Sequence, residues 1–558
     1  MTIELALIPI VPVIAALIIP IISLVTRNQY VYATVQLIAS TIVTYFSLIL
    51  FSKTMENQVL VYAFGGWLPP IGIVYVADSL NSLYGLIACS LALLISIYSF
   101  WYYRFVREPH WLSLLMLLLL SGVTGVIYTG DVFNFFVMLE VLALSSYALV
   151  SFFKRRKWAI EAAASYAFIG ALATTFFLLG VSFIYLSYGT LNIADISWKA
   201  NPQLTIRAEG VVNGYNQSNI MSRWSGECIG YKCYWDIRLA SSLAVAFILW
   251  ALTFEAGIFP NNYWLSSAYT EAPTPASAMF AGVVDKVGTY GVLRLFLTIF
   301  TPSSILMFSV ANTPFRDIVI HALAILGLIT GFLGAIIMAI QKDVKRLLSY
   351  STVSHIGLIF IAMAGLTSNH YPDTASLILS AILFHSLTHA YGESLLFLGL
   401  GTLSTIAGSR RIEDLEGYGR IYLGLSIPIT IGTLSLLGVA PLGGFFSKYL
   451  LFLALSKAGL LPYALSIIII TGISAIGYFR IIHALFFEIP RVIRKEKILV
   501  ASTVCLVIAL ILVALGVLFA TGYLYGVFEK IGCSVTTGVD EYIGSLNNVA
   551  RILGGETK

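Results

Sequence analysis

The sequence has 558 residues, of which 59% are hydrophobic and 11% are charged, and its formal net charge is +5. Soluble domains carry roughly 25% charged residues, so this composition excludes a soluble enzyme and indicates a membrane protein along the whole chain. The positive charge is spread over short loops, where it sets membrane topology and does not indicate nucleic-acid binding.

Apolar runs of about 20 residues predict membrane-spanning helices. The first run, residues 4–26, has no basic segment before it and no small-residue cleavage site after it, so we expect a mature helix. The predicted fold is an all-α polytopic membrane protein with about fourteen transmembrane helices. They cover residues 4–26, 30–52, 79–102, 111–129, 131–152, 159–187, 241–262, 275–300, 318–341, 344–366, 374–402, 421–455, 460–487 and 498–522.

Lysine and arginine cluster in every second loop of this prediction. The positive-inside rule places these loops in the cytoplasm, and both termini then lie outside. We therefore expect a multi-pass protein of the cell membrane with an external loop at residues 188–240. The basic loop residues are Arg27, Arg104, Arg107, Lys154, Arg155, Arg156, Lys157, Lys342, Lys345, Arg346, Arg410, Arg411, Arg420, Arg491, Arg494, Lys495 and Lys497.

Two expected spans are interrupted in the same way, the seventh at Gly257 and Pro260 and the twelfth at Gly438 and Pro441. A proline removes a backbone donor, so a break survives in a membrane only where the freed groups are buried in protein or face water. Ordinary kinking is the alternative, but matched breaks five helices apart favour two inverted five-helix repeats, helices 4–8 and 9–13. The predicted regions are residues 1–110, 111–300 with the external insert 188–240, 301–490, and 491–558 with an external tail.

The five cysteines fit no zinc or iron–sulfur spacing. Cys228 and Cys233 lie in the external insert, where oxidation is permitted, so we expect a disulfide; two free thiols are the alternative. Asn216 begins an Asn-Gln-Ser glycosylation sequon, a tripeptide that is common by chance. Cys89 and Cys505 lie inside apolar runs and are predicted to be small core residues.

Several ionisable side chains fall at membrane depth, where each charge costs at least ~2.5–3.5 kcal/mol. Such residues indicate a path for protons or small cations. Histidine suits such a relay because its unperturbed pKa is ~6.5, although a buried histidine can also be a packing residue, which is our interpretation of His483. His385, His389 and Glu393 follow at successive turns and share one helix face. The charged residues are Glu140, Glu255, Asp285, Lys286, Glu393 and Lys448.

Five long segments resemble the antiporter-like subunits of respiratory complex I and of Mrp-type cation/proton antiporters. The chain is most similar to the D subunits of the Mrp type, and similar subunits occur in membrane-bound hydrogenases and sulfur-reducing complexes. The resemblance implies that Glu140, Lys286 and Lys448 belong to a line of proton-carrying groups. It also implies that His355, His385 and His389 join that line. The segments are GDVFNFFVMLEVLALSSYALV (130–150), FEAGIFPNNYWLSSAYTEAPTPASAMFAGVVDKVGTYGVLRLF (254–296), QKDVKRLLSYSTVSHIG (341–357), LFHSLTHAYGESLLFLGLG (383–401) and GVAPLGGFFSKYL (438–450).

The sequence departs from the family pattern at Glu255 and Glu393, where the family usually has lysine, and at Asp285, where it tends to be apolar. Glu140 would then face Glu255. Two carboxylates ~4 Å apart repel by about 4 kcal/mol at an effective dielectric constant of ~20. The pair would therefore share a proton or hold a cation, and sodium becomes a candidate because hard cations favour oxygen ligands.

The leading hypothesis is an ion-translocating subunit of a multisubunit membrane complex that moves protons or exchanges them for sodium. The alternative is a structural subunit whose relay is disabled by Glu255 and Glu393. A carrier of an organic solute is disfavoured because no substrate-binding motif accompanies the breaks. No dinucleotide fingerprint or cysteine cluster is present, so we expect no cofactor, no bound metal and no catalytic redox site in this chain. Electron chemistry would belong to partner subunits, including any peripheral redox module.

Overall fold

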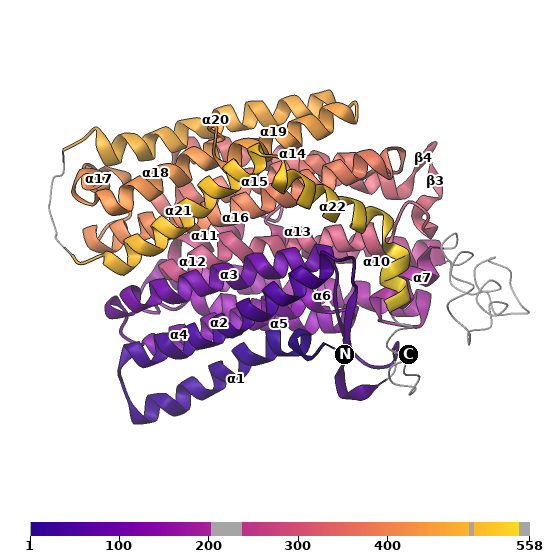
Figure 1. Cartoon of the computed structure of the whole chain (residues 1–558), viewed down its shortest axis with the longest axis horizontal. Helices are drawn as coiled ribbons and strands as arrows, with labels where there is room; N and C mark the ends of the chain where they lie inside the picture. The colour runs from indigo at the N-terminus through magenta and orange to yellow at the C-terminus, as the bar shows by residue number, and fades with distance from the viewer. Residues whose placement is uncertain (1, 68, 202–236, 490–495, 546–558) are drawn as a thin grey trace, which may run out of the picture.

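The structure is a computed structural model that describes residues 2–67, 69–201, 237–489 and 496–545. Long helices lie side by side along one common direction (Figure 1). In the described part of the chain, eleven helices are long and apolar enough to cross a membrane. They are α1 (Ile3–Val25), α2 (Gln29–Thr54), α3 (Ser79–Tyr102), α4 (Pro109–Tyr128), α5 (Val132–Val150), α6 (Lys157–Tyr188), α10 (Ile237–Ala256), α14 (Phe315–Ile340), α15 (Val344–Ala362), α20 (Leu461–Phe486) and α21 (Leu499–Ala520).

The three remaining spans of the sequence prediction are also helical, but they are interrupted or polar. Residues 275–300 form α12 (Thr274–Met279), the π-helical segment η4 (Phe280–Val284), α13 (Asp285–Arg294) and the π-helical segment η5 (Leu295–Ile299). Residues 374–402 lie in α16 (Asp373–Ala407), and residues 421–455 form α18 (Leu423–Leu437) and α19 (Gly443–Lys457). The helical membrane fold is confirmed. The span count differs because these segments hold polar groups and breaks inside the bundle.

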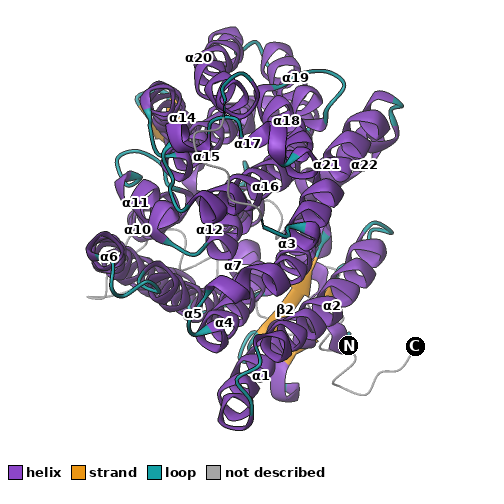
Figure 2. Cartoon of the chain, turned by 90° about the vertical axis from the view of Figure 1, so that its left-hand side faces the viewer, coloured by secondary structure: helices purple, strands orange, loops and turns teal. Residues whose placement is uncertain are grey.

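α16 is the central helix of the second half of the chain. It packs against α12, α15, α18, α19, α21 and α22 (Tyr523–Thr537), which surround it in Figure 2. Nearly all of its residues are buried, including both histidines and Glu393. A helix that faces protein on all sides can carry polar residues that lipid would exclude.

Both predicted breaks are present, and they share one backbone geometry. Gly257 and Gly438 follow the last residues of α10 and α18 with φ of +72° and +88°, values that glycine adopts without strain. Ile258 N–H donates to the Thr253 carbonyl at 2.9 Å, and Val439 N–H donates to the Leu434 carbonyl at 2.9 Å. Each break is therefore a Schellman-type helix end, after which α11 (Tyr263–Glu271) and α19 begin. The inverted repeat and the four regions stay predictions.

Short antiparallel hairpins are the only sheets among the described residues: β1 (Leu60–Ala63) with β2 (Val74–Ala77), and β3 (Ser309–Val310) with β4 (Thr313–Pro314). Cys89 and Cys505 are fully buried, which confirms their prediction as core residues. Cys228, Cys233 and Asn216 lie outside the described residues, so the disulfide and the sequon stay predictions.

Three of the basic loops predicted to share one side of the membrane contribute to one hollow. Arg156, Lys157, Lys345 and Arg410 line this hollow of about 640 Å³. Arg410 is paired in this hollow with Glu271 at 2.8 Å. This common position agrees with the predicted alternation of loops, while the side of the membrane on which it lies stays a prediction.

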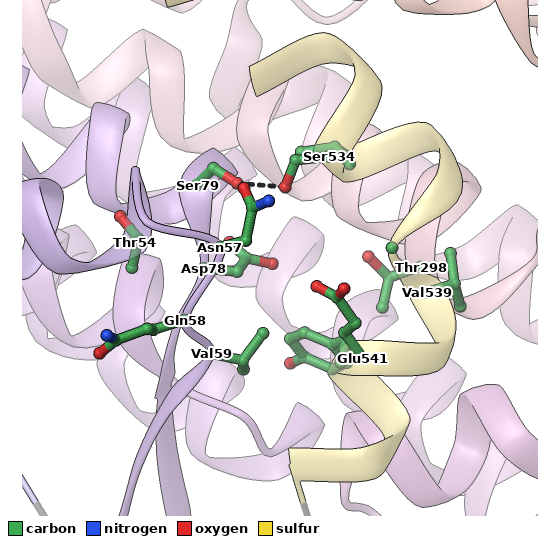
Figure 3. A pocket seen from close by; sticks show the side chains of 13 residues that line it. Thr54, Asn57, Gln58, Val59, Asp78, Ser79, Thr298, Ser534, Val539 and Glu541 are labelled. Atoms are coloured by element: carbon green, nitrogen blue, oxygen red, sulfur yellow. Dashed lines mark hydrogen bonds between the residues drawn. The ribbon is translucent and has the colours of Figure 1, made fainter. Parts of the chain in front are cut away.

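A buried ion pair holds the N-terminal end of α3, the end away from the hollow lined by Arg156 and Arg410. Arg294 donates to both oxygens of Asp78 at 2.6 and 2.9 Å, and its guanidinium lies 5.0 Å from the ring centre of Tyr542. Beside the pair, Ser79 and Ser534 share a hydrogen bond of 2.7 Å and line a small cavity (Figure 3). The pair thus joins α3, α13 and the segment after α22.

We predict that Asp78→Asn destabilises the protein by about 3 kcal/mol, because it leaves Arg294 buried without its counter-charge. Asparagine caps a helix as well as aspartate, so the cap of α3 at this position is retained. The thermal unfolding midpoint in detergent measures the effect. Glu413→Gln, which removes an exposed ion pair with Arg411, is the control and should leave the midpoint unchanged. An unchanged midpoint for Asp78→Asn would show that the pair does not hold this end.

Candidate ion-translocation site

Lys286 begins a line of buried polar groups in the interior of the bundle. It is the second residue of α13, which follows directly on the π-helical segment η4. Its Nζ donates to the Ala281 carbonyl at 2.6 Å and to the Asp285 carboxylate at 2.9 Å. Nζ also lies 2.8 Å from Nδ1 of His389 on α16. If the ammonium is the donor, Nδ1 accepts, and the ring proton of His389 is on Nε2.

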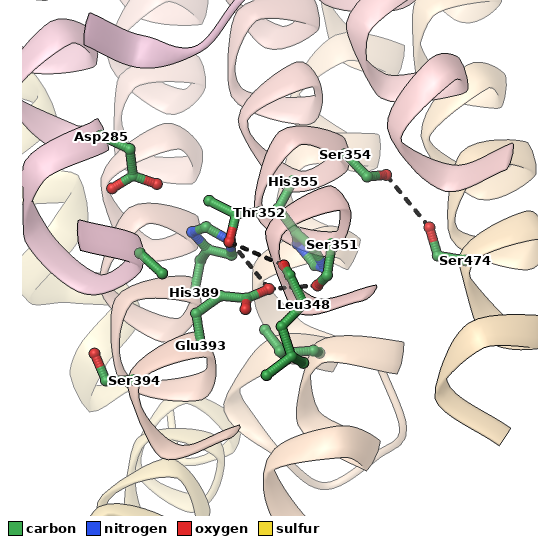
Figure 4. A network of polar contacts seen from close by, with 12 residues as sticks. Asp285, Leu348, Ser351, Thr352, Ser354, His355, His389, Glu393, Ser394 and Ser474 are labelled. Carbon is green, nitrogen blue, oxygen red and sulfur yellow. Dashed lines mark hydrogen bonds and ion pairs between the residues drawn. The ribbon is translucent and has the colours of Figure 1, made fainter. Parts of the chain in front are cut away.

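Glu393 lies one turn beyond His389 on α16, and its Oε1 is 3.7 Å from Nε2 of that histidine. The Ser351 hydroxyl on α15 donates to the same carboxylate oxygen. Ser351 Oγ is also 2.5 Å from the Tyr478 hydroxyl on α20, which is 3.1 Å from Nε2 of His355. Figure 4 shows Ser351 and His355 on one helix, opposite His389 and Glu393 on the next.

The line continues from His355 toward α19. His355 Nδ1 is 3.3 Å from Nε2 of His385, and His385 Nδ1 is 3.0 Å from Ser447 Oγ. The next residue, Lys448, donates from Nζ to the Leu436 carbonyl at 2.5 Å. This carbonyl belongs to the last turn of α18, which has no further helical partner because the helix ends there. Polar groups therefore run from Asp285 to Lys448 through α13, α16, α15, α20 and α19.

Glu255 stands apart from this line. It is 1% exposed, and neither carboxylate oxygen has a hydrogen-bond partner among the described residues. Its charge is close enough to interact with Glu140 on α5 and with Tyr147 and Tyr166. Glu140 itself is half-buried. No hydrogen bond within the described segments joins either glutamate to Asp285 or Lys286.

Three members of the line were missed in the sequence. Ser351 lies one turn before His355, and Ser447 precedes Lys448, so their positions beside known candidates were a weak signal. Tyr478 had no signal, because it lies on α20, more than a hundred residues after Ser351. His483 lies off the line, 3.9 Å from Glu488, and its side chain is 63% exposed, so its interpretation as a buried packing residue is wrong.

Residues 129–474, more than half of the chain, match the family described as the transmembrane part of NADH:quinone oxidoreductase and Mrp antiporter subunits. The chain is 29% identical over 399 residues to the D subunit of a Na(+)/H(+) antiporter of Alkalihalophilus pseudofirmus, covering 72% of this chain and 70% of that one. It is 31% identical over 437 residues to the N subunit of an NADH-quinone oxidoreductase of Desulforudis audaxviator, covering 76% and 75%.

Among solved structures, a chain of the membrane-bound sulfane sulfur reductase, an archaeal respiratory membrane complex, superposes with a TM-score of 0.79. The two chains are 27% identical, and the match covers 97% of this chain and 99% of that one. The resemblance found in the sequence is thereby confirmed. The protein belongs to the NADH:quinone oxidoreductase/Mrp antiporter family of membrane subunits. Within the described segments, no group of three metal-ligating side chains is arranged to hold a metal ion.

We predict that Glu255→Lys, which introduces the lysine that the resemblance implies at this position, changes the ion preference or the pH optimum of transport without unfolding the protein. The reason is that a lysine is expected to pair with Glu140, which carries a charge of the same sign as Glu255. Ion uptake into vesicles, measured with and without sodium across a pH series, tests this expectation.

Glu140→Gln should reduce transport more than Glu255→Gln, because the resemblance assigns Glu140, and not Glu255, to the proton-carrying line. Glu161→Gln on the neighbouring α6 is a matched control that should leave uptake unchanged. A Glu255→Lys protein with unaltered ion preference and pH profile would contradict a shared site at this pair.

Proposed function

We propose that this chain moves protons across the membrane as an antiporter-like subunit of a multisubunit complex. The observation that carries the proposal is the series of polar side chains from Lys286 to Ser447, next to Lys448, which hydrogen bonds join at every step except between His389 and Glu393. Neighbouring members lie within 3.7 Å of each other. Chains of acidic residues and histidines inside a membrane protein are typical of proton relays. The members are buried, with 0–3% exposure from Lys286 to Ser447 and 8% at Lys448.

We further propose that Glu140 and Glu255 form the part of the protein that exchanges sodium for protons. A buried carboxylate without a hydrogen-bond partner is costly unless it is protonated or binds a cation. Carboxylate oxygens suit a hard cation such as sodium. One relative is named as part of a Na(+)/H(+) antiporter, which supports this assignment.

The competing hypothesis is a structural subunit with a disabled relay. Glu255 favours it, because the line of polar groups does not reach this residue by hydrogen bonds within the described segments. Glu393 opposes it, because this acid is bonded into the line through Ser351 and lies beside His389. We therefore propose a working relay from Lys286 to Lys448.

Partner subunits complete the proposed assembly. The relatives are subunits of a Na(+)/H(+) antiporter and of an NADH-quinone oxidoreductase, and the matched structure is a chain of the membrane-bound sulfane sulfur reductase complex. We place the protein in the cell membrane with both termini outside, and any redox cofactor in a partner subunit and not in this chain.

Lys448→Ala is predicted to abolish ion movement while assembly is retained, because it removes the charged end of the line. The measurement is proton uptake by vesicles that contain the intact complex, with assembly checked by co-purification of the partner subunits. Lys457→Ala, an exposed lysine at the end of the same helix, should transport normally.

Normal transport by Lys448→Ala would remove this residue from the path and count against the proposed function. If the Lys448→Ala variant fails to assemble and yields no assembled, inactive complex, Lys448 instead has a structural role at the break after α18.

A further inference from the structure

His389 and His355 lie side by side, but no direct hydrogen bond joins them. Their rings stack with centroids 4.8 Å apart and planes inclined by 24°. The nitrogen protons and lone pairs of imidazole lie in the ring plane, so a proton cannot pass between stacked faces. The direct step between these two histidines is therefore blocked.

A second route joins the same two residues through hydroxyl groups. From His389 it passes to Glu393 Oε1, then to Ser351, then to the Tyr478 hydroxyl, and it ends at His355 Nε2. All members are buried within α15, α16 and α20. Figure 4 shows the members on α15 and α16. Its one long link is the 3.7 Å between His389 Nε2 and Glu393 Oε1.

The hydrogen bonds of this route can all point in one direction. Ser351 donates to Glu393, so the Tyr478 hydroxyl can donate to Ser351, and His355 Nε2–H can donate to Tyr478. His355 Nδ1 then accepts from His385 Nε2–H. The carboxylate is the final acceptor of the chain. This orientation makes Glu393 the group that collects a proton arriving from the side of Lys448.

We propose that Glu393, Ser351 and Tyr478 form a proton bridge between His355 and His389, and that this bridge excludes sodium. The inference rests on the proposed function and names the ion that passes this segment. One proton enters the bridge at His385, which takes it up and passes its own Nε2 proton to Nδ1 of His355. His355 then gives its Nε2 proton to Tyr478, Tyr478 gives its own to Ser351, and Ser351 gives its own to Glu393. Each hydroxyl keeps one hydrogen, and only the Glu393 carboxylate becomes protonated. Onward transfer requires that Lys286 has first released a proton, so that its neutral Nζ accepts from His389 Nδ1–H and His389 Nε2 is free. The carboxyl proton then passes to His389 Nε2 while the Nδ1 proton passes to Lys286, and the hydroxyl groups and the histidine tautomers return to their starting state.

Sodium cannot follow the same route, because the bridging atoms already touch. The links from Ser351 to His385 measure 2.5, 3.1 and 3.3 Å, which is hydrogen-bond distance without room for an inserted ion. A sodium ion would also need several oxygen ligands, whereas histidine nitrogens form one end of the bridge. Glu393 is thus a working replacement for the family lysine.

The test uses Tyr478→Phe and Ser351→Ala in the intact complex, reconstituted in vesicles with a pH-sensitive dye inside. Each variant removes one hydroxyl from the bridge, so proton movement should fall by about tenfold or more. Glu393→Gln should cause a similar loss, because the amide keeps the shape but cannot take up a proton.

Matched controls remove equivalent hydroxyl groups outside the bridge. Tyr391→Phe loses a buried hydroxyl bonded to Ser90, on the same helix as Glu393. Ser354→Ala loses a buried hydroxyl on α15 that bonds Ser474 and the Gly331 carbonyl. Both should retain the proton movement of the unmodified complex.

The outcomes separate the bridge from the proposed function. Normal proton movement in Tyr478→Phe, with Lys448→Ala inactive, would overturn the bridge and leave the proposed function standing. Normal proton movement in both Tyr478→Phe and Lys448→Ala would overturn the bridge and the proposed function. Sodium uptake that falls in Tyr478→Phe while sodium-free proton movement stays normal would show that sodium passes this segment, which also overturns the inference. Equal losses in the bridge variants and in their controls would mean that packing, and not proton transfer, is being measured.

Discussion

The cost of removing charge from water governs the interior of this protein. Lipid supplies no hydrogen bonds, so each buried charge must find its partners within the helices. Lys286 and Lys448 both meet backbone carbonyls where a regular α-helix is interrupted, one in the π-helical segment η4 and one at the end of α18. The irregular backbone and the buried lysines therefore depend on each other. Each interruption provides acceptors, and each ammonium satisfies a carbonyl that would otherwise be costly to bury.

Close packing at the break after α18 determines which groups Lys448 can contact. A side chain at Gly444 would place a Cβ 1.8 Å from the Ser435 carbonyl oxygen, so only glycine lets the start of α19 approach the last turn of α18. One turn later, Lys448 lies opposite Leu436, and Ser447 faces His385 on α16. The close approach of the α18 and α19 backbones thus determines which residues end the polar line.

Glu255 and Glu393, which the resemblance places at lysine positions of the family, have different surroundings. Glu393 accepts a hydrogen bond from Ser351 at Oε1 and lies beside His389, while its Oε2 has no hydrogen-bond partner among the described residues. Glu255 has no such partner at either oxygen. A carboxylate can take part in a relay when a donor contacts it, because the donor stabilises its charged form. Beside a second carboxylate, as at Glu255, a carboxylate requires a bound proton or cation. The two departures from the family pattern therefore carry different chemistry.

The sequence by itself determined the class of fold, the helical segments, the two breaks and most charged members of the line. Apolar run length, glycine–proline pairs and the energetic cost of intramembrane charge are local properties that can be recognised without a structure. Only the tertiary structure decided which of these residues meet. Tyr478 joins the line because α20 packs beside α15, and Glu255 is excluded from it because no hydrogen bond in the described residues bridges the gap to Asp285. Contacts between distant helices depend on packing, which one sequence does not specify residue by residue.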